Sequence, residues 1–430
     1  MVSHQHQKKG LIMDKLLIKG GARLVGGITI SGAKNAALPL MATALMAEEG
    51  MVLDNLPPLA DIICMCELLD HLGVASSRDG ETVTFQPAEK AITDAPYDIV
   101  RKMRASVLVL GPLLARYGKA RVSLPGGCAI GTRPVDLHIM AMEKLGAVVT
   151  LEDGYVVAEA KHGLKGAEIT FPLVSVGATE NAMMAAVLAD GQTVLENAAR
   201  EPEISDLAEC LNKLGAKVSG HGTSRIVIDG VASLKQCRHA VVADRIEAGT
   251  FALAAAMTQG KVTLKNMRPE HLAALFSAMA QAGVDVEINQ DQVTITSNDR
   301  PRPVDITTDP YPGFPTDLQA QFMALMTLAS GTSAISETIF ENRFMHVPEL
   351  SRMGADIHVT GGQAHVHGVE RLNAAPVMAT DLRASVSLVL AGLTAEGETV
   401  LQRVYHLDRG YDRLEEKLNA CGAEIRRVNG

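Results

Sequence analysis

Tryptophan is absent from this 430-residue chain, and Phe, Tyr and Trp together supply only 3% of it. Aliphatic side chains, alanine and methionine must therefore fill most of the core. Long hydrophobic runs are also missing, because Gly, Pro or a charged residue interrupts each one well short of the length that spans a bilayer. The N-terminal residues 1–10 are polar and basic and lack the apolar segment of a signal peptide. We therefore expect a globular protein without a membrane segment.

Cysteine is scarce, and its positions are scattered along the chain. No pair has the CxxC or Cys/His spacing of a zinc site, so we expect no metal centre. In a chain of this length, the pattern predicts reduced thiols and a cytoplasmic location. The six cysteines are Cys64, Cys66, Cys128, Cys210, Cys237 and Cys421.

Basic residues do not predominate. The chain has 40 Lys and Arg against 49 Asp and Glu, and its formal net charge is −9. This balance argues against general nucleic-acid binding. A local group of Lys and Arg can still bind an anionic small molecule within an acidic protein. The glycine-rich signatures GxGxxG and GxxxxGK[ST] do not follow any expected strand, so nucleotide fingerprints of those kinds are missing.

What the chain does contain is a repeat. Six times, at intervals of about 70 residues, an amphipathic helix-like run ends at a glycine that is followed by Ala or Val. Glycine is favoured there by a left-handed helix C-cap. After each of the first five copies the residues alternate as in a β-strand. The six glycines are Gly73, Gly146, Gly215, Gly283, Gly354 and Gly422.

A second pattern alternates with the first. It is an Ala- and Leu-rich helix that ends near a glycine and is followed by a short strand. The two patterns together predict six α/β units, each with two helices and about four strands, rather than a doubly wound Rossmann sheet. Six units group naturally as three plus three, and a cleft between two such lobes is a common place for a small-molecule site.

Residues 124–138 show neither helical nor strand periodicity and are expected to form a loop. Its glycines allow the backbone to approach a ligand closely. A nearby cation favours the thiolate of Cys128, and Arg133 offers a planar fork for a carboxylate or phosphate. The composition suggests a mobile loop that carries a reactive thiol to an anionic substrate. An ordinary surface loop with an incidental cysteine is the alternative.

Residues 125–134 closely resemble the catalytic loop of the UDP-N-acetylglucosamine enolpyruvyl transferases, which belong with the EPSP synthases. Other segments resemble the same family in the same order, from about residue 13 to the C-terminus. This disfavours the incidental cysteine. The further matching segments are residues 30–39, 102–106, 175–179, 314–317, 341–344, 379–383 and 406–411.

The resemblance implies an α/β fold of two inside-out barrel lobes, each of three βαβαββ repeats around a pseudo-threefold axis. That agrees with the six units found from the repeat. In relatives the chain begins in one lobe, completes the other and then returns. We therefore expect residues 34–242 to form the lobe with the Cys128 loop. Residues 13–33 plus 243–430 are expected to form the lobe with Asp317, and residues 1–12 an N-terminal extension.

The implied reaction transfers enolpyruvyl from phosphoenolpyruvate to the 3-hydroxyl of UDP-N-acetylglucosamine and releases phosphate, by addition and then elimination. It is the first committed step of bacterial peptidoglycan synthesis, and it needs no metal or cofactor. Cys128 resembles the family's general acid, which also adds to phosphoenolpyruvate and is alkylated by fosfomycin. A thiol suits both roles. Some members have Asp at this place, so the cysteine predicts sensitivity to fosfomycin.

Two carboxylates are implied near the reacting atoms. Asp317 is the candidate base, or the group that orients the sugar hydroxyl. Its alternative role is that of an N-cap for the helix that follows it. Asp381 matches a position near the catalytic centre and is implied to assist lobe closure or elimination.

Phosphoenolpyruvate is small and highly anionic, so its site needs several cations. Lys34 is implied to take part in catalysis as well as binding, and it follows Gly32 at the start of a helix, where backbone N–H groups favour anions. Each basic residue taken alone could equally be a solvated surface charge. The residues implied to bind the two substrates are Lys34, Asn35, Arg104, Arg133, Pro134, Val135, Asp136, Leu137, Val174, Ser175, Val176, Gly177, Asp317, Ile339, Arg383 and Arg409.

The chain departs from the family's pattern at one position. Many relatives have Lys just before the Val-Ser-Val-Gly stretch, where it contacts the diphosphate, whereas this chain has Leu173. We do not assign diphosphate binding to that side chain. Glu201 and Glu203 are expected to serve a structural role between units.

Three other functions are compatible with parts of the sequence. The shikimate-pathway enolpyruvyl transferase shares the fold but has no equivalent of the Cys128 loop. RNA-phosphate cyclases share it too, but their signature is absent and the acidic charge disfavours RNA. A non-catalytic sensor of UDP-sugars is disfavoured because Lys34, Cys128, Arg133, Asp317 and Arg409 are all present.

Overall fold

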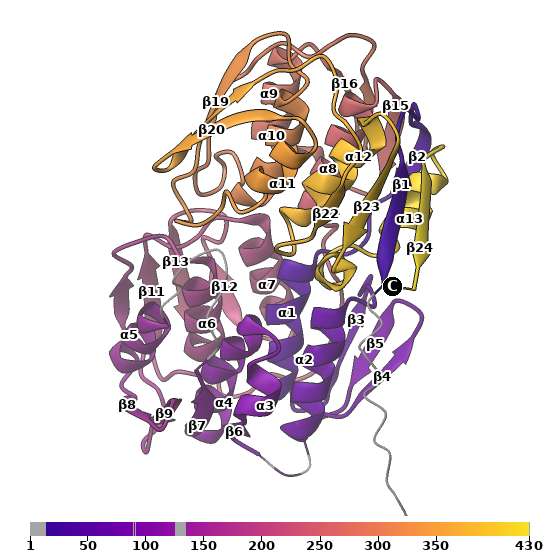
Figure 1. Cartoon of the computed structure of the whole chain (residues 1–430). Coiled ribbons are helices and arrows are strands. Elements are labelled where there is room, and N and C mark those ends of the chain that lie inside the picture. Colours follow the sequence, from indigo (N-terminus) through magenta and orange to yellow (C-terminus); the bar gives the residue numbers. More distant parts are fainter. Residues whose placement is uncertain (1–13, 89, 91, 125–134, 430) are drawn as a thin grey trace, which may run out of the picture.

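The computed structural model describes residues 14–88, 90, 92–124 and 135–429, which form two halves stacked on one another (Figure 1). The expected N-terminal extension lies outside the described residues. So do three of the predicted site residues, Cys128, Arg133 and Pro134.

The described strands form six four-stranded sheets, and all six repeat one pattern. One edge strand runs parallel to its neighbour, and the other two pairings are antiparallel. Three of the sheets lie in the half shown lower in Figure 1. Their strands, in order across each sheet, are β14 (Cys237–Ala240), β3 (Met51–Asp54), β5 (Thr82–Phe85) and β4 (Ser76–Asp79); β6 (Asp94–Ala95), β7 (Lys119–Ser123), β9 (Tyr155–Glu159) and β8 (Val148–Glu152); and β10 (Glu168–Thr170), β11 (Gln192–Glu196), β13 (Arg225–Asp229) and β12 (Lys217–Ser219).

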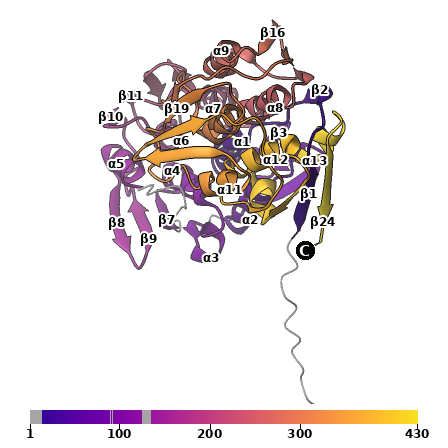
Figure 2. The ribbon, with the colours of Figure 1, turned by 45° about the horizontal axis from the view of Figure 1, so that its top comes forward.

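The other three sheets lie in the upper half, and strands from the two ends of the chain complete two of them. In Figure 2, as in Figure 1, β1 near the N-terminus and β24 near the C-terminus stay side by side, as their antiparallel pairing requires. The strands in order are β2 (Val25–Thr29), β15 (Lys261–Lys265), β17 (Gln292–Thr296) and β16 (Asp285–Asn289); β18 (Ile306–Thr307), β19 (Thr332–Ser336), β21 (Gln363–His367) and β20 (Asp356–Thr360); and β22 (Pro376–Met378), β23 (Glu398–Gln402), β1 (Lys15–Lys19) and β24 (Glu424–Val428).

Six mostly buried helices form the centre of the two halves. They are rich in Ala, Leu and Met on every side, and a helix that is apolar all round must be buried. In the first half α4 packs against α6, and in the second α8, α10 and α12 pack against one another. The six are α1 (Lys34–Ala42), α4 (Leu110–Tyr117), α6 (Val176–Ala186), α8 (Arg245–Met257), α10 (Gln319–Met326) and α12 (Ser385–Thr394).

In the described residues, seven further α-helices and five short 3-10 helices connect the sheets. They are α2 (Ala60–His71), α3 (Tyr97–Val100), α5 (Asp136–Lys144), α7 (Pro202–Lys213), α9 (Ala273–Gln281), α11 (Val347–Arg352) and α13 (Leu414–Asn419), with η1 (Thr43–Leu45), η2 (Arg104–Val109), η3 (Pro269–Leu272), η4 (Thr316–Leu318) and η5 (Val404–Arg409).

The glycines of the repeat lie at the predicted helix ends, one or two residues after the C-cap of each helix. Each has a positive φ, between 90° and 107°, which a residue with a Cβ adopts only with strain. Each is followed by a strand, and this includes Gly422, which leads into β24. The sequence alone indicates a strand after only the first five. The six α/β units are therefore confirmed, and the last is completed by β1 from the other end of the chain.

The hydrophobic core is divided in two. One cluster of buried side chains runs from Ala33 to Val241, and the other combines residues 16–30 with residues 246–425. We call the parts around these clusters the first half and the second half. This separation supports our proposal that residues 34–242 form one lobe and that residues 13–33 with 243–430 form the other.

The chain passes between the halves twice, and the two passages lie side by side. Ala33 donates its N–H to the carbonyl of Val242 at 2.7 Å, and Asp244 donates to the carbonyl of Ser31 at 2.8 Å. We call this paired stretch, residues 31–33 with 241–244, the crossing. Just beyond it, Arg245 of α8 forms a buried ion pair with Glu203 of α7 at 3.0 Å. Glu203 thus links the halves, in line with its expected structural role.

Candidate active site

Lys34 opens α1 and points into a buried ion-pair cluster between the halves. Its Nζ lies 3.2 Å from Oδ2 of Asp61, in the first turn of α2. Arg409, from η5 in the second half, donates its Nε to Oδ1 of the same carboxylate at 2.8 Å. Asp61 therefore holds two of the predicted phosphoenolpyruvate-binding cations, one from each half.

The protonation states of this cluster follow from its burial and its charges. Burial lowers the pKa of the Lys34 ammonium, and the nearby guanidinium groups of Arg383 and Arg409 lower it further, against the opposing effect of Asp61. Burial alone would raise the pKa of Asp61, but Lys34 and Arg409 outweigh it and hold that pKa below its usual value. The carboxylate is thus ionised, and the guanidinium groups of Arg383 and Arg409 beside it suit an anionic ligand.

Asp317 lies in η4, on the second half, and its carboxylate contacts side chains from both halves. Oδ1 accepts a hydrogen bond from Nη2 of Arg343 at 2.7 Å, and Oδ2 accepts one from Asn35 of the first half at 3.5 Å. Arg383 approaches Oδ2 to 3.7 Å. The carboxylate remains partly exposed, at 23% of its side-chain surface, so a substrate hydroxyl can reach it.

The alternative role of Asp317 as a helix cap does not hold. The N-cap position of α10 is Leu318, and neither η4 nor α10 has a capping hydrogen bond from a side chain. The aspartate instead forms the ion pair with Arg343. Its place in the fold is therefore explained by contacts across the site and not by the helix that follows it.

Arg383 is buried and extends the cluster toward the crossing. Its Nη2 lies 3.2 Å from Asp244, and its Nη1 donates to the carbonyl of Gly410 at 3.2 Å. Burial alone would lower the pKa of this guanidinium, but Asp244, Tyr411 and Asp317 more than offset it, so the pKa is raised. Arg383 is a permanent cation that joins Asp317 to the crossing.

Asp381 uses only one of its carboxylate oxygens in the described structure. Oδ1 accepts from the N–H groups of Arg383 and Ala384, both at 2.8 Å, just ahead of α12. Oδ2 is buried and has no hydrogen-bond partner among the described residues. A buried carboxylate oxygen without a partner is costly, and such atoms often serve a functional role. This is compatible with the role proposed for Asp381 near the reacting atoms.

A second group of predicted residues gathers at the starts of two adjoining helices. Asp136 opens α5, while Val176 and Gly177 open α6, whose N-cap Ser175 accepts a hydrogen bond from Ala178 at 3.4 Å. The helices pack closely, because a Cβ on Gly177 would lie 3.2 Å from the ring of His138. The remaining members of this group are Val135, Leu137 and Val174, which are half-buried or exposed.

Leu173 and Ile339 lie in two different halves of the structure. Leu173 is 71% exposed and offers no charge to a diphosphate. Ile339 follows β19, and its N–H donates to Glu337 at 2.9 Å, whose other carboxylate oxygen accepts from Thr316 beside Asp317. Glu337 thus ties the segment of Ile339 to that of Asp317.

The structure adds three site residues for which the sequence analysis assigned no role. Arg343 lies within the matching segment 341–344, so its motif was a usable signal. The sequence around Asp61 and Asp244 contained no such signal. An aspartate in or before the first turn of a helix is already explained as a local cap or as a partner of the helix dipole. Asp244 is in fact also an N-cap, for α8, while it binds Arg383.

His138 makes this region sensitive to acid. Its ring is buried and its Nδ1 lies 3.0 Å from Asn181. Burial, aided by Arg104, lowers the pKa of His138 to about 4. The unfolded chain therefore takes up the proton first, so the stability that neutral His138 provides is present above pH 6.5 and is lost as the pH falls toward 4.

We expect the free energy of unfolding to fall by about 2 kcal/mol more between pH 7 and pH 5 in the native chain than in His138→Gln. Urea titrations at the two pH values measure this difference. The exposed His162→Gln is the matched control and should keep the native pH dependence. Equal losses in the native chain and in His138→Gln would contradict the assignment.

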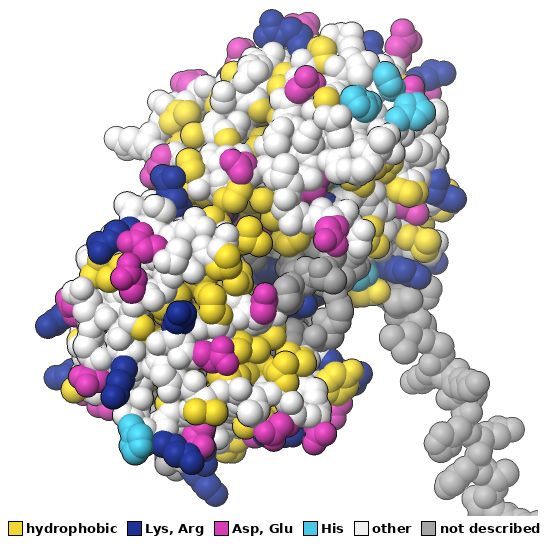
Figure 3. Space-filling model, turned by 90° about the vertical axis from the view of Figure 1, so that its left-hand side faces the viewer, with side chains coloured by type: hydrophobic (Ala, Val, Ile, Leu, Met, Phe, Trp, Pro, Cys, Tyr) yellow, Lys and Arg dark blue, Asp and Glu magenta, His cyan; other side chains and the backbone are white. Residues whose placement is uncertain are grey.

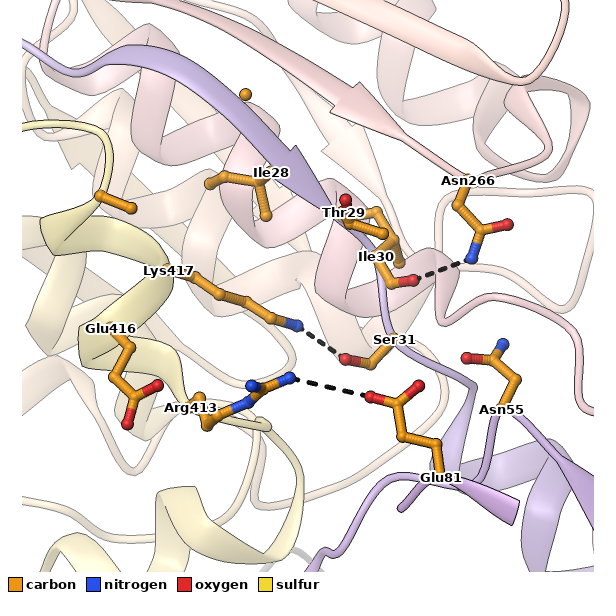
Figure 4. A pocket seen from close by; sticks show the side chains of 12 residues that line it. Ile28, Thr29, Ile30, Ser31, Asn55, Glu81, Asn266, Arg413, Glu416 and Lys417 are labelled. Atoms are coloured by element: carbon orange, nitrogen blue, oxygen red, sulfur yellow. Dashed lines mark hydrogen bonds and ion pairs between the residues drawn. The ribbon is translucent and has the colours of Figure 1, made fainter. Parts of the chain in front are cut away.

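On the outer face that Figure 3 shows, the surface is hollowed where the two halves meet, and hydrophobic side chains gather there. A separate pocket of about 310 Å³ lies beside the crossing (Figure 4). There Arg413 of the second half reaches Glu81 of the first at 3.7 Å, and Lys417 donates to Ser31 at 2.7 Å. None of the predicted site residues lines this pocket.

None of the helices in the described ranges combines the length and the hydropathy that a bilayer crossing requires. No cluster of three or more His, Cys, Asp or Glu side chains in those ranges is arranged to hold a metal ion.

Comparisons with known proteins show the family of the chain. The family model described as EPSP synthase (3-phosphoshikimate 1-carboxyvinyltransferase) matches residues 18–418. The UDP-N-acetylglucosamine 1-carboxyvinyltransferase of Xanthobacter autotrophicus is 58% identical over 429 residues, which cover 97% of this chain and 100% of the relative. The protein of that name from Caulobacter vibrioides is 59% identical over 423 residues, covering 97% and 99%.

Solved structures show the same fold. The enolpyruvyl transferase NikO from Streptomyces tendae superposes with a TM-score of 0.87 at 27% identity, over 97% of this chain and 100% of that one. An EPSP synthase from Acinetobacter baumannii superposes with a TM-score of 0.77 at 17% identity, over the same shares. The chain therefore belongs to the EPSP synthase family of enolpyruvyl transferases and, within it, to the UDP-N-acetylglucosamine 1-carboxyvinyltransferases.

Proposed function

We propose that this chain transfers the enolpyruvyl group of phosphoenolpyruvate to the 3-hydroxyl of UDP-N-acetylglucosamine and releases phosphate. The observation that carries the proposal is the cluster between the halves. Buried Lys34 and Arg409 share Asp61 there, and Asp317 lies on the facing half, bonded to Asn35 beside Lys34. This arrangement provides cations for a small, highly charged donor next to a carboxylate for a hydroxyl.

In the addition step, the sugar 3-oxygen bonds to C2 of phosphoenolpyruvate, and a proton is delivered to the C3 methylene carbon. Asp317 accepts or orients the hydroxyl proton, since its partly exposed carboxylate is held by Arg343. Cys128 is our candidate for the acid that protonates C3. The product of the step is a tetrahedral ketal that keeps the phosphate.

In the elimination step, the bond from C2 to the phosphate oxygen breaks and a proton leaves the C3 carbon, which forms the enolpyruvyl ether. Lys34, Arg133 and Arg409 are proposed to stabilise the charge that develops on the leaving phosphate. Asp381 is proposed to assist here or in closure. These steps use only groups of the chain itself and the two substrates.

The uridine nucleotide is proposed to lie along the starts of α5 and α6. The residues concerned are Arg133, Pro134, Val135, Asp136, Leu137, Val174, Ser175, Val176 and Gly177, with Ile339 from the second half. Arg104 is proposed to bind the substrate pair. N–H groups at helix starts attract phosphate oxygens. Because Leu173 cannot bind the diphosphate by charge, backbone donors at these helix starts are proposed to bind it in part.

The two halves are proposed to close over the substrates as lobes, with the loop that bears Cys128 between them. The enzyme is proposed to work in the cytoplasm, where both substrates are small soluble molecules, and to take part in peptidoglycan synthesis and thereby in cell-wall formation.

The test is phosphate release from phosphoenolpyruvate with two acceptors, UDP-N-acetylglucosamine and shikimate 3-phosphate, each with and without fosfomycin. We expect release only with the UDP-sugar, and its loss after incubation with the drug or on the substitution Cys128→Ala. Release with shikimate 3-phosphate instead would transfer the assignment to the other branch of the family. Binding of the UDP-sugar without release would favour a sensor.

A further inference from the structure

Two cysteines with no role in the proposed reaction come together in the first half. Cys210 is in the last turn of α7, and Cys237 is the first residue of β14. Their Sγ atoms are 3.9 Å apart. We propose that these two thiols form a reversible disulfide when the protein meets hydrogen peroxide or a related peroxide, and that the bond fixes α7 against the strand that leads into the crossing.

The geometry permits the bond with little movement. A disulfide has an S–S length of about 2.05 Å, so the two sulfurs must approach by roughly 2 Å, which rotation about the side-chain bonds can supply. The helix and the strand already pack against each other. Among the cysteines that the structure describes, all are free thiols, so the pair is present in its reduced form.

Cys64 and Cys66 show that closeness in sequence does not produce such a pair. Both lie on α2, two residues apart, so their side chains point to different sides of the helix. Cys64 is buried and Cys66 only partly buried. These two thiols are an internal reference, because any non-specific oxidation by peroxide will reach Cys66 as well.

The surroundings assign different roles to the two thiols. Cys237 is partly exposed, whereas Cys210 is buried. The hydrogen bond from Cys210, together with the charge of Lys213, lowers the pKa of Cys237 despite its partial burial, and the pKa of Cys210 is raised. Asp206 and His239 also lie nearby, with the Nδ1 of His239 2.9 Å from Lys213. Cys237 is thus the thiolate that would attack a peroxide first.

The oxidation balances in two steps. The Cys237 thiolate attacks one oxygen of the peroxide, so an S–O bond forms and the O–O bond breaks. Cys237 becomes a sulfenic acid and hydroxide is released, which takes up the proton that the thiol lost. The Cys210 thiol then displaces the sulfenic hydroxyl, which leaves as water, and the S–S bond forms. In sum, two thiols lose two electrons and two protons, and one peroxide is reduced to two waters. A dithiol reductant reverses the change by thiol exchange.

The disulfide would restrict the crossing because α7 already contacts the crossing through a hydrogen bond. One turn before Cys210, Asp206 accepts a hydrogen bond from the N–H of Val242 at 3.2 Å, and its other oxygen lies 2.8 Å from His239 of β14. At its other end, α7 reaches the second half through Glu203 and Arg245. A covalent link between α7 and β14 would therefore restrict the helix and the crossing together. This inference does not depend on the proposed function.

The experiment treats the full-length folded protein with hydrogen peroxide, blocks the remaining thiols with N-ethylmaleimide and digests it without reductant. We expect mass spectrometry to find peptides joined through Cys210 and Cys237 in most molecules, and to lose them after dithiothreitol. Amide hydrogen exchange of residues 237–244 should slow by several-fold in the oxidised protein and recover on reduction.

The variants separate a specific bond from general oxidation. In Cys210→Ala, Cys237 should instead be trapped as a sulfenic acid by dimedone, and the exchange of residues 237–244 should not respond to peroxide. If Cys210→Ala disturbs folding, Cys237→Ser at the more exposed position is the second variant. It should also make the exchange of residues 237–244 insensitive to peroxide. The inference is overturned if Cys210 and Cys237 stay free while Cys66 is oxidised, or if the joined peptides arise only in urea.

Discussion

The substitution Asp317→Asn is expected to lower kcat for phosphate release by about 10²–10⁴-fold, the usual contribution of a positioned acid–base group. Asparagine has nearly the same shape and can still accept a hydrogen bond from Arg343, but it cannot take the hydroxyl proton. Because Asp317 is partly exposed and outside any helix cap, the loss cannot be ascribed to a damaged helix start.

Steady-state kinetics and calorimetric binding of UDP-N-acetylglucosamine separate the two effects. We expect the dissociation constant of the UDP-sugar to change far less than kcat, and Asp317→Glu to restore part of the rate. Asp305→Asn is the matched control, since Asp305 is also in the second half, is exposed, and accepts a backbone hydrogen bond from Ala334 at 2.7 Å. A kcat for Asp317→Asn that equals that of Asp305→Asn would show that Asp317 is not the base.

The substitution Lys34→Met is expected to reduce kcat/KM for phosphoenolpyruvate by about 10²–10³-fold, the cost of losing one preorganised donor to a developing anion. The variant removes the ammonium group but keeps an unbranched chain in α1. It also leaves Asp61 paired with Arg409 alone, so one guanidinium must face both the carboxylate and the donor's phosphate. KM for phosphoenolpyruvate should therefore rise more than KM for the UDP-sugar.

Lys417→Met is the matched control for that prediction. Lys417 is partly buried and also paired, with Glu247 at 2.8 Å, but it faces the pocket beside the crossing and not the candidate site. Its loss should reduce thermal stability without a selective change in either KM. If Lys34→Met lowered stability and raised both KM values to the same extent as Lys417→Met, then Lys34 would have only a structural role.

Several features of the fold could be predicted from local sequence patterns. The six glycines mark helix ends because only glycine adopts the left-handed cap without strain, and the structure gives all of them a positive φ. The helices that are apolar on every side had to be central. The end of the repeat was missed in part, because β24 is rich in charged residues and its alternation is weak.

Part of the candidate site could also be predicted from the sequence, and part could not. The segments that carry Lys34, Asp317, Arg383 and Arg409 stood out in the sequence, and the structure brings these four side chains into one cluster. Their partners did not stand out. Asp61 and Asp244 occupy the starts of helices, where an aspartate has a sufficient local explanation.

The sequence by itself determined the repeat, the helix ends and the all-apolar helices, since each depends on neighbours a few positions away, and its resemblance to a family supplied the candidate residues for the chemistry. Only the tertiary structure decided the pairings: Asp61 with Arg409, Asp317 with Arg343, and Cys210 with Cys237. These pairs join segments whose separation along the chain leaves no periodic trace. Their distances follow from how the sheets and helices pack, and packing is a property of the whole fold.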